Sequence, residues 1–308
     1  MQDKLISKLR AIEIQTISCC NSRCIVCPWS QIQDSVPRQS MSEYIWNKAL
    51  EGISALAPDI IYPYNNNEPL LDQKIESRIL DIRSLSPRSH LEISTNGLLL
   101  TEKKSRFLVN NVDSILISLF GSDEPSNLQI MGKGMSYNKI KHNILQLKKM
   151  NEAHGYKSII NIAKLVDSPF MLNDTVLKDW IFGEDEGIPI RYYKFVDRSA
   201  NVGDFKQRDR TIKAYGCDYN RHIASTFIRY NGDVNFCCHD WRNEYIMGNL
   251  HENSLIDIIN GEKYNLIRKM VDGIIDSDID FLCKKCVHCK TYRINIKNDG
   301  VPEKTPHH

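Results

Sequence analysis

Residues 20–28 read Cys20-Asn21-Ser22-Arg23-Cys24-Ile25-Val26-Cys27-Pro28, which places three thiols in a C-x3-C-x2-C arrangement. An apolar segment precedes them, so the cysteines lie on a loop where a predicted strand ends. Three thiolates at this spacing can bind three irons of a [4Fe–4S] cube and leave the fourth iron without a protein ligand, which makes that position reactive. A zinc knuckle, or a fourth ligand at Cys19, are the alternatives. Because adjacent cysteines seldom reach one metal, we interpret Cys19 as a small residue at the strand end.

Apolar or β-branched runs alternate with helical patterns through the first two-thirds of the chain. This alternation is typical of repeated βα units around a parallel sheet, where chemistry takes place at the carboxyl ends of the strands. Ser42 is expected to cap a helix over residues 43–56. The sequence predicts a partial (β/α)6 barrel with strands at Ile12–Ile17, Asp59–Tyr64, His90–Thr95, Ser114–Leu119, Ser158–Val166 and Pro189–Phe195.

The composition is that of an ordinary globular protein: 308 residues, 42% hydrophobic and 25% charged, with a net charge of +2. This charge balance gives no basic excess for nucleic acid. The sequence contains neither an apolar run of membrane-spanning length nor the apolar core of a signal peptide. We therefore expect a cytoplasmic protein that binds neither nucleic acid nor membrane.

The remaining cysteines gather near the carboxyl terminus. Cys217 and Cys237 flank a hairpin signal at Asn231-Gly232, and Cys283, Cys286 and Cys289 follow a helical insert. In a reducing compartment, thiols grouped in this way are more often metal ligands than disulfides. Four thiolates on two chain segments suit a closed iron–sulfur cluster or a structural zinc, and spacing alone does not choose between them.

Several motifs after the cysteine loop resemble those of radical S-adenosylmethionine (SAM) enzymes. Asn66-Asn67-Glu68-Pro69 follows the second predicted strand and is similar to the Gly-Gly-Glu-Pro motif of that family. Ser94-Thr95-Asn96-Gly97 follows the third, and the fourth ends at Ile117-Ser118-Leu119. Gly132-Lys133-Gly134-Met135 before a helix is also similar. In order and spacing the resemblance covers about residues 10–200.

The resemblance implies the cofactors and the residues that hold them. Cys20, Cys24 and Cys27 would bind a [4Fe–4S] cluster whose open iron is chelated by SAM, and one-electron reduction would yield a 5′-deoxyadenosyl radical. Two departures are notable. Val26 stands where the family often has an aromatic residue, a role that Trp29 could take, and asparagines replace both glycines, although Asn tolerates positive φ. The candidate SAM-binding residues are Val26, Asn67, Glu68, Ser94, Asn96 and Ser118.

The carboxyl-terminal cysteines resemble those of SPASM-type auxiliary domains or their shortened twitch form. This likeness implies one auxiliary [4Fe–4S] cluster on Cys217, Cys237, Cys283 and Cys286, with Cys289 as a spare or alternative ligand. The fold class is accordingly α/β, a partial (β/α)6 barrel of parallel strands with a small C-terminal iron–sulfur domain made of a β-hairpin and helices. We expect the barrel at 1–204, the auxiliary domain at 205–297 and a mobile tail at 298–308.

Cys238 adjoins a predicted ligand on a strand, so its thiol is expected to point to the opposite side, toward the substrate. Such a thiol could return a hydrogen atom to a substrate radical and invert the carbon, as in radical epimerases that act on peptides or aminoglycosides. A dehydrogenase or a peptide maturase, which would pass the second electron to the auxiliary cluster, is the alternative, and a zinc-ribbon binding protein is the non-enzymatic one.

The early position of the cysteine loop leaves little room ahead of it for a leader-recognition domain. This favours a small polar molecule or a short peptide as substrate. The resemblance also implies an external one-electron reductant of the flavodoxin or ferredoxin type.

Overall fold

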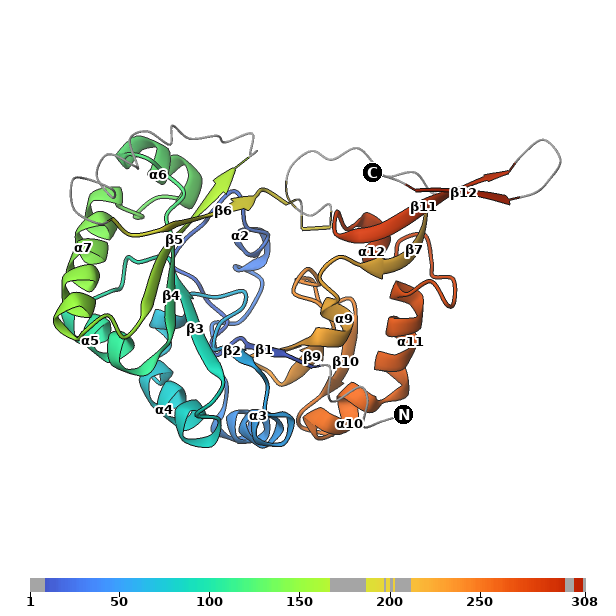
Figure 1. Ribbon diagram of the computed structural model, residues 1–308, viewed down its shortest axis with the longest axis horizontal. Helices are drawn as coiled ribbons and strands as arrows, with labels where there is room; N and C mark the ends of the chain where they lie inside the picture. The colour runs from blue at the N-terminus through green and yellow to red at the C-terminus, as the bar shows by residue number, and fades with distance from the viewer. Residues whose placement is uncertain are drawn as a thin grey trace.

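The computed structural model describes residues 9–166, 187–196, 198, 199, 202, 212–296 and 302–306. Six parallel strands form its centre, in the spatial order of the chain: β1 (Ala11–Ile14), β2 (Ile60–Tyr62), β3 (His90–Thr95), β4 (Ser114–Ser118), β5 (Ile159–Val166) and β6 (Ile190–Lys194). The strands curve around an open interior, as Figure 1 shows. The six predicted strands and the partial barrel are confirmed, with strand ends shifted by at most three residues.

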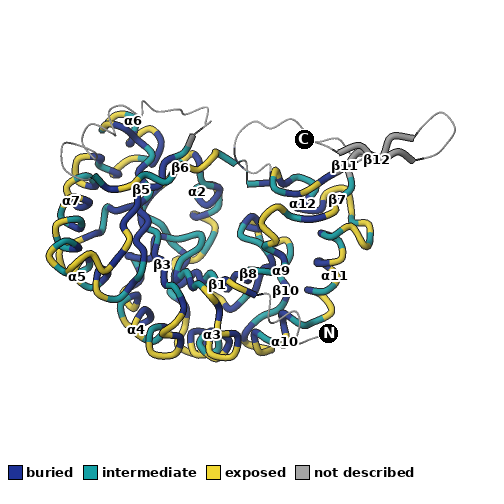
Figure 2. Tube along the Cα trace, viewed as in Figure 1, coloured by how far each residue is buried: buried dark blue, intermediate teal, exposed yellow. Residues whose placement is uncertain are grey.

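Side chains alternate across this sheet. Ile12, Ile14, Ile61, Ile93 and Ile115 are fully buried and belong to the main apolar core. The residues between them, among them Glu13, Tyr62 and Glu92, share the other face, because successive strand residues point to opposite sides. The inner face of the barrel is therefore polar, although β1, β3 and β4 are largely buried (Figure 2).

Helices cover the outer face of the sheet. They are α3 (Glu43–Leu56), α4 (Ile75–Leu85), α5 (Glu102–Asn111), α6 (Glu124–Met131) and α7 (Tyr137–Ala153), with the short α2 (Trp29–Ile32) and the 3-10 turn η1 (Pro69–Leu71) in the loops. Polar side chains begin the longer helices: Ser42 caps α3 and accepts from the N–H of Ile45, as predicted. Their apolar faces pack on the sheet, which leaves the carboxyl ends of the strands open.

The carboxyl-terminal third extends the same sheet. After β7 (Ile212–Cys217) and α9 (Arg221–Ala224), β8 (Ser225–Ile228) pairs parallel to β1, and the antiparallel β9 (Asp233–Asn235) and β10 (Ile246–Asn249) continue outward. The sequence predicted this hairpin but not its place beside β1. The reason lies in β1, which would otherwise be an edge strand with unpaired backbone groups.

The remaining elements surround the last cysteines. They are α10 (Leu255–Asn260), α11 (Glu262–Val271), α12 (Leu282–Lys285), β11 (Cys289–Ile296) and β12 (Pro302–Pro306). β11 pairs with both β7 and β12 in a separate three-stranded sheet. β12 lies within the tail that the sequence predicted to be mobile, whereas the boundary predicted between residues 204 and 205 lies outside the described residues. In the part of the chain that the structure describes, no helix has the length and apolar character needed to cross a bilayer.

Candidate functional site: two cysteine sites and a polar barrel mouth

The first site is the loop after β1, which is held by the end of α6. The N–H groups of Arg23 and Ile25 donate to the carbonyls of Met131 and Ile130, at 3.0 and 2.9 Å. Gly132 follows at φ +96°, and a Cβ there would lie 3.1 Å from Arg23. This close approach explains why glycine follows α6, and it fixes the backbone that carries the cysteines.

The three thiols of this loop suit a cationic cluster. Burial and the neighbouring Cys27 thiol raise the pKa of Cys24 to about 12, although the Ser22 hydroxyl, 2.9 Å from its sulfur, opposes the shift. Burial, then Glu68 and the other two thiols, raise the pKa of Cys20 as well. Three mutually repelling thiolates in a buried loop need the positive charge of metal ions, so the donor set fits an iron–sulfur cluster.

A hydrogen-bond network joins this loop to the loops after β2 and β3. The Glu68 carboxylate accepts from the Leu70 N–H, the Thr95 hydroxyl and the Asn96 N–H, at 3.1, 2.7 and 2.8 Å. The Asn96 amide donates to Asn21 Oδ1 of the cysteine loop at 2.7 Å. Three sequence motifs therefore converge at the carboxyl ends of the strands, as their order along the chain predicted.

The other candidate SAM-binding residues occupy different surroundings. Val26 belongs to the apolar core at 8% exposure, and Trp29 is 2% exposed with no hydrogen-bond partner for its Nε1. Asn67 accepts from the Asn65 N–H through its side chain, at 2.9 Å. Ser94 and Ser118 are half-buried at the strand ends. Neither Asn66 nor Asn67 in the turn after β2 has a positive φ. The turn therefore does not need the tolerance of positive φ that the sequence analysis expected of these asparagines.

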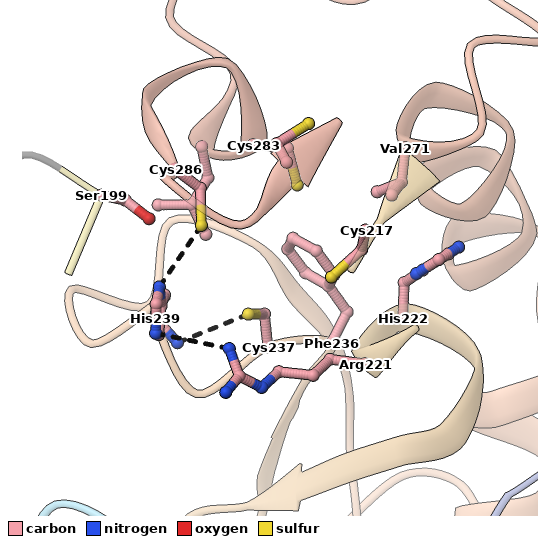
Figure 3. A pocket seen from close by; sticks show the side chains of 12 residues that line it. Ser199, Cys217, Arg221, His222, Phe236, Cys237, His239, Val271, Cys283 and Cys286 are labelled. Carbon is pink, nitrogen blue, oxygen red and sulfur yellow. Dashed lines mark hydrogen bonds between the residues drawn. The ribbon is translucent and has the colours of Figure 1, made fainter. Parts of the chain in front are cut away.

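The second site is a cavity in the carboxyl-terminal third (Figure 3). The four predicted ligands line it, together with Cys289, which the sequence left as a spare. Cys289 on β11 lies directly opposite Cys217 on β7. Among the described residues, no three cysteine, histidine or carboxylate side chains have the spacing of metal ligands, and the five thiols surround the cavity. A donor set made mainly of thiols fits an iron–sulfur cluster.

Two histidines that the sequence reading missed also line this cavity. Burial disfavours ionisation of Cys217, yet the nearby His222 and two backbone N–H groups hold the pKa of Cys217 below its usual value. His222 in turn contacts Asp272 at 2.8 Å. Burial, then the charges of Arg198 and Arg221, lower the pKa of His239 to about 2, so the imidazole is neutral. Their only sequence signal was proximity to Cys217 and Cys237.

Polar side chains on the inner face of the strands form a further group, which we call the barrel mouth. Glu13 accepts from the Asn65 amide at 3.0 Å. Glu92 accepts from Tyr64 and Ser114 at 3.1 and 3.0 Å. Arg191 Nη1 lies 3.4 Å from Glu92 Oε2. This wall combines carboxylates, phenols and a guanidinium on the inner face.

Cys238 is not among the residues that line the cysteine cavity. Its hydrogen bond to Cys237, followed by the charges of Arg221 and Arg198, lowers the pKa of its thiol, although burial opposes the shift. Glu13 interacts electrostatically with Cys238 and with the same two guanidiniums. Cys238 lies in the turn after β9 rather than on a strand, so the strand alternation that predicted the direction of its thiol does not apply. Asp240, by contrast, is a structural residue, 3% exposed and bonded to Asn235.

A partial parallel barrel, a three-cysteine loop at its open end and a second cysteine site are the features expected of radical SAM proteins with an auxiliary domain. Residues 217–290 match the SPASM domain, an iron–sulfur cluster-binding domain. Among curated proteins, GTP 3′,8-cyclase of Aquifex aeolicus (strain VF5) is 22% identical over 213 residues, which are 67% of this chain and 62% of the cyclase. The mitochondrial GTP 3′,8-cyclase of Arabidopsis thaliana is 24% identical, over 67% of this chain and 52% of that protein. The match thus spans less than two-thirds of either relative.

Solved structures share the fold at low sequence identity. BtrN in complex with AdoMet and 2-DOIA superposes with a TM-score of 0.56 at 17% identity, covering 86% of this chain and 88% of BtrN. Streptococcus suis SuiB bound to its precursor peptide SuiA superposes with a TM-score of 0.66 at 14% identity, covering 91% of this chain and 70% of SuiB. anSMEcpe with bound AdoMet superposes with a TM-score of 0.62 at 14% identity, covering 90% of this chain and 86% of anSMEcpe. These comparisons confirm the expected fold, and the SPASM match supports an iron–sulfur cluster at the carboxyl-terminal cysteines.

Proposed function

We propose that this chain is a radical SAM epimerase that removes hydrogen from a substrate C–H and returns hydrogen from the Cys238 thiol. The observation that carries the proposal is the position of Cys238, which does not line the cavity of the auxiliary cysteines and is close enough to Glu13, Arg198 and Arg221 to interact with their charges. A thiol on that side can reach a radical centre from the face opposite the first abstraction.

In this proposal the two cysteine sites have separate roles. Cys20, Cys24 and Cys27 hold the cluster that binds SAM, while Cys217, Cys237, Cys283 and Cys286 hold the auxiliary cluster. When bound, the first cluster and SAM supply a carbon-centred radical that abstracts hydrogen from the substrate. The Glu68 network fixes the loops around SAM, and we assign SAM contacts to Asn67, Ser94, Asn96 and Ser118.

The hydrogen return must balance in electrons and protons. The Cys238 S–H bond breaks as the new substrate C–H bond forms, which leaves a thiyl radical on Cys238. One electron from a flavodoxin- or ferredoxin-type reductant and one proton from solvent restore the thiol. The net reaction is inversion at carbon without oxidation of the substrate.

The barrel mouth supports a polar substrate. Glu13, Glu92 and Arg191 offer both acceptors and donors, which suits a short peptide or an amino sugar better than an apolar molecule. The similar structures include one with 2-DOIA and others with the SuiA and Cp18Cys peptides. They are consistent with either substrate class.

Oxidation is the second candidate, because the auxiliary cavity adjoins Cys238 through Cys237 and could accept the second electron. A peptide maturase would use the same electron route. A zinc-ribbon binding protein accounts for neither the barrel nor the three-cysteine loop.

Solvent deuterium separates the reactions. With SAM, a chemical reductant and panels of short peptides and amino sugars in D2O, an epimerase forms 5′-deoxyadenosine and incorporates one deuterium, because the thiol exchanges with solvent. Cys238→Ser should still consume SAM but give no inverted product. Cys19→Ser is the matched control and should behave as the native protein. A product two hydrogens lighter that survives Cys238→Ser would replace epimerisation by oxidation.

Iron analysis tests the class itself. Two [4Fe–4S] clusters correspond to about eight irons per chain, and Cys24→Ala should leave about four and abolish 5′-deoxyadenosine. Zinc without iron would contradict the class.

A further inference from the structure

His239 lies between the auxiliary cysteines and the barrel mouth. The side chain is 1% exposed. Its Nδ1 lies 3.5 Å from the sulfur of Cys286, and its Nε2 lies 3.4 Å from Arg198 Nη1 and 3.5 Å from Arg221 Nη1. Figure 3 shows the ring at the edge of the cavity, with Cys286 on one side and Arg221 on the other.

The two guanidiniums determine which ring nitrogen carries the proton. A guanidinium can only donate hydrogen bonds, so the His239 Nε2 that two of them approach must act as an acceptor. A neutral imidazole with an accepting Nε2 carries its hydrogen on Nδ1. On this basis we assign the Nδ1–H tautomer, whose N–H points at the sulfur of Cys286.

We propose that His239 is a positioning residue for the auxiliary cluster, which donates an N–H···S hydrogen bond to the Cys286 thiolate and raises the reduction potential of the cluster. Reduction adds negative charge that spreads onto the ligand sulfurs. A donor aimed at one of those sulfurs stabilises the reduced form more than the oxidised form.

The surroundings of the ring make this role specific to His239. His222 also lines the cavity, but one of its ring nitrogens is bonded to the Asp272 carboxylate. Arg198 and Arg221, which orient His239, also interact with Glu13 and Cys238 at the barrel mouth. The imidazole therefore connects the substrate side of the protein with the auxiliary site.

The test is a redox titration of the reconstituted holoprotein, followed by electron paramagnetic resonance. The parent carries Cys24→Ala, so that only the auxiliary cluster contributes to the signal. His239→Phe fills the ring volume without a donor. His239→Asn keeps an amide N–H near the Nδ1 position. His288→Phe is the matched control, since that ring lies 5.5 Å from His239 at the same site.

In His239→Phe we expect the equilibrium constant for cluster reduction to fall about tenfold, which corresponds to a potential about 59 mV more negative. In His239→Asn and His288→Phe the equilibrium constant for cluster reduction should stay within about twofold of the parent value, which corresponds to a change in potential of at most about 18 mV. A structural role alone would change iron content but would not separate Phe from Asn in this way.

Equal potentials in His239→Phe and the parent would overturn the proposal, and so would an Asn variant as low as the Phe variant. If the Phe variant does not retain iron, His239→Ala removes the donor without adding bulk and takes its place, with the same expected fall. If neither retains iron, the Asn variant decides: a potential at the parent value supports the hydrogen bond, and a lowered one refutes it.

Discussion

The Glu68 carboxylate accepts the backbone N–H of Asn96 at 2.8 Å and thereby ties the loop after β2 to the loop after β3. Thr95 and the Leu70 N–H occupy the other oxygen of Glu68. Its side chain is 2% exposed. Glu68 thus supports the site from within the protein, in addition to any contact with SAM.

Glu68→Gln should therefore destabilise the fold and weaken SAM binding. In one orientation of the glutamine amide its NH2 group meets the Asn96 N–H, and in the other it meets the Leu70 N–H. Either orientation brings two hydrogen-bond donors together. The loss should be about 1–3 kcal/mol. Anaerobic denaturation and SAM titration calorimetry measure the two effects. Glu102→Gln, at an exposed glutamate on α5, should change neither.

The sequence predicted the barrel because its strands are apolar and its helices begin at polar caps, both of which are local signals. It also placed Glu68 and Asn96 among the candidate SAM-binding residues at the strand ends, but it did not predict the hydrogen bond between them. It could not place β8 beside β1, since pairing depends on which edge is free after the barrel has formed. Nor could it find Glu13, His222 or His239, which acquire their roles only from partners distant in sequence.

The auxiliary site should tolerate the loss of one particular thiol. The Cys289 thiol, then burial, raises the pKa of Cys283 well above its usual value, and both side chains line the cavity. Two neighbouring thiols at one cavity can each supply the fourth thiolate. We expect Cys283→Ser and Cys289→Ser each to keep about eight irons per chain and the double variant to keep about four, as measured by iron analysis.

Cys286→Ser is the contrasting variant at the same cavity. It should lose the auxiliary irons alone. Loss of iron in Cys289→Ser with retention in Cys283→Ser would instead identify Cys289 as the obligatory ligand.

The turn that carries Cys237 depends on Gly232. Its φ is +88°, and a Cβ would lie 2.7 Å from Ile45 Cδ1 on α3. Gly232→Ala should therefore incur both the left-handed strain, about 1–2 kcal/mol, and a packing conflict of about 1–3 kcal/mol. Gly155→Ala separates the two, because Gly155 has φ +78° and an added methyl group there would have nothing within 4 Å. Denaturant unfolding should show a larger loss of unfolding free energy for Gly232→Ala than for Gly155→Ala. Equal losses would show that the packing conflict with Ile45 contributes nothing.

Glu13 should make stability depend on pH. Burial, then the Cys238 thiol, raises the pKa of Glu13 well above 4.5, although Arg221, Arg198 and Asn65 oppose the shift. The folded protein therefore holds this proton more tightly than the unfolded chain does. The resulting stability is fully present below the unfolded pKa and is lost as the pH rises through the folded pKa.

Between about pH 4 and pH 9, a range that brackets the ordinary glutamate pKa, the native protein should lose more stability than Glu13→Gln, whose amide does not titrate. Anaerobic thermal unfolding at a series of pH values measures the difference, and Glu102→Gln should follow the native curve. Parallel curves for the native protein and Glu13→Gln would show that Glu13 ionises at its ordinary pKa, and the barrel mouth would then hold a full negative charge beside Cys238.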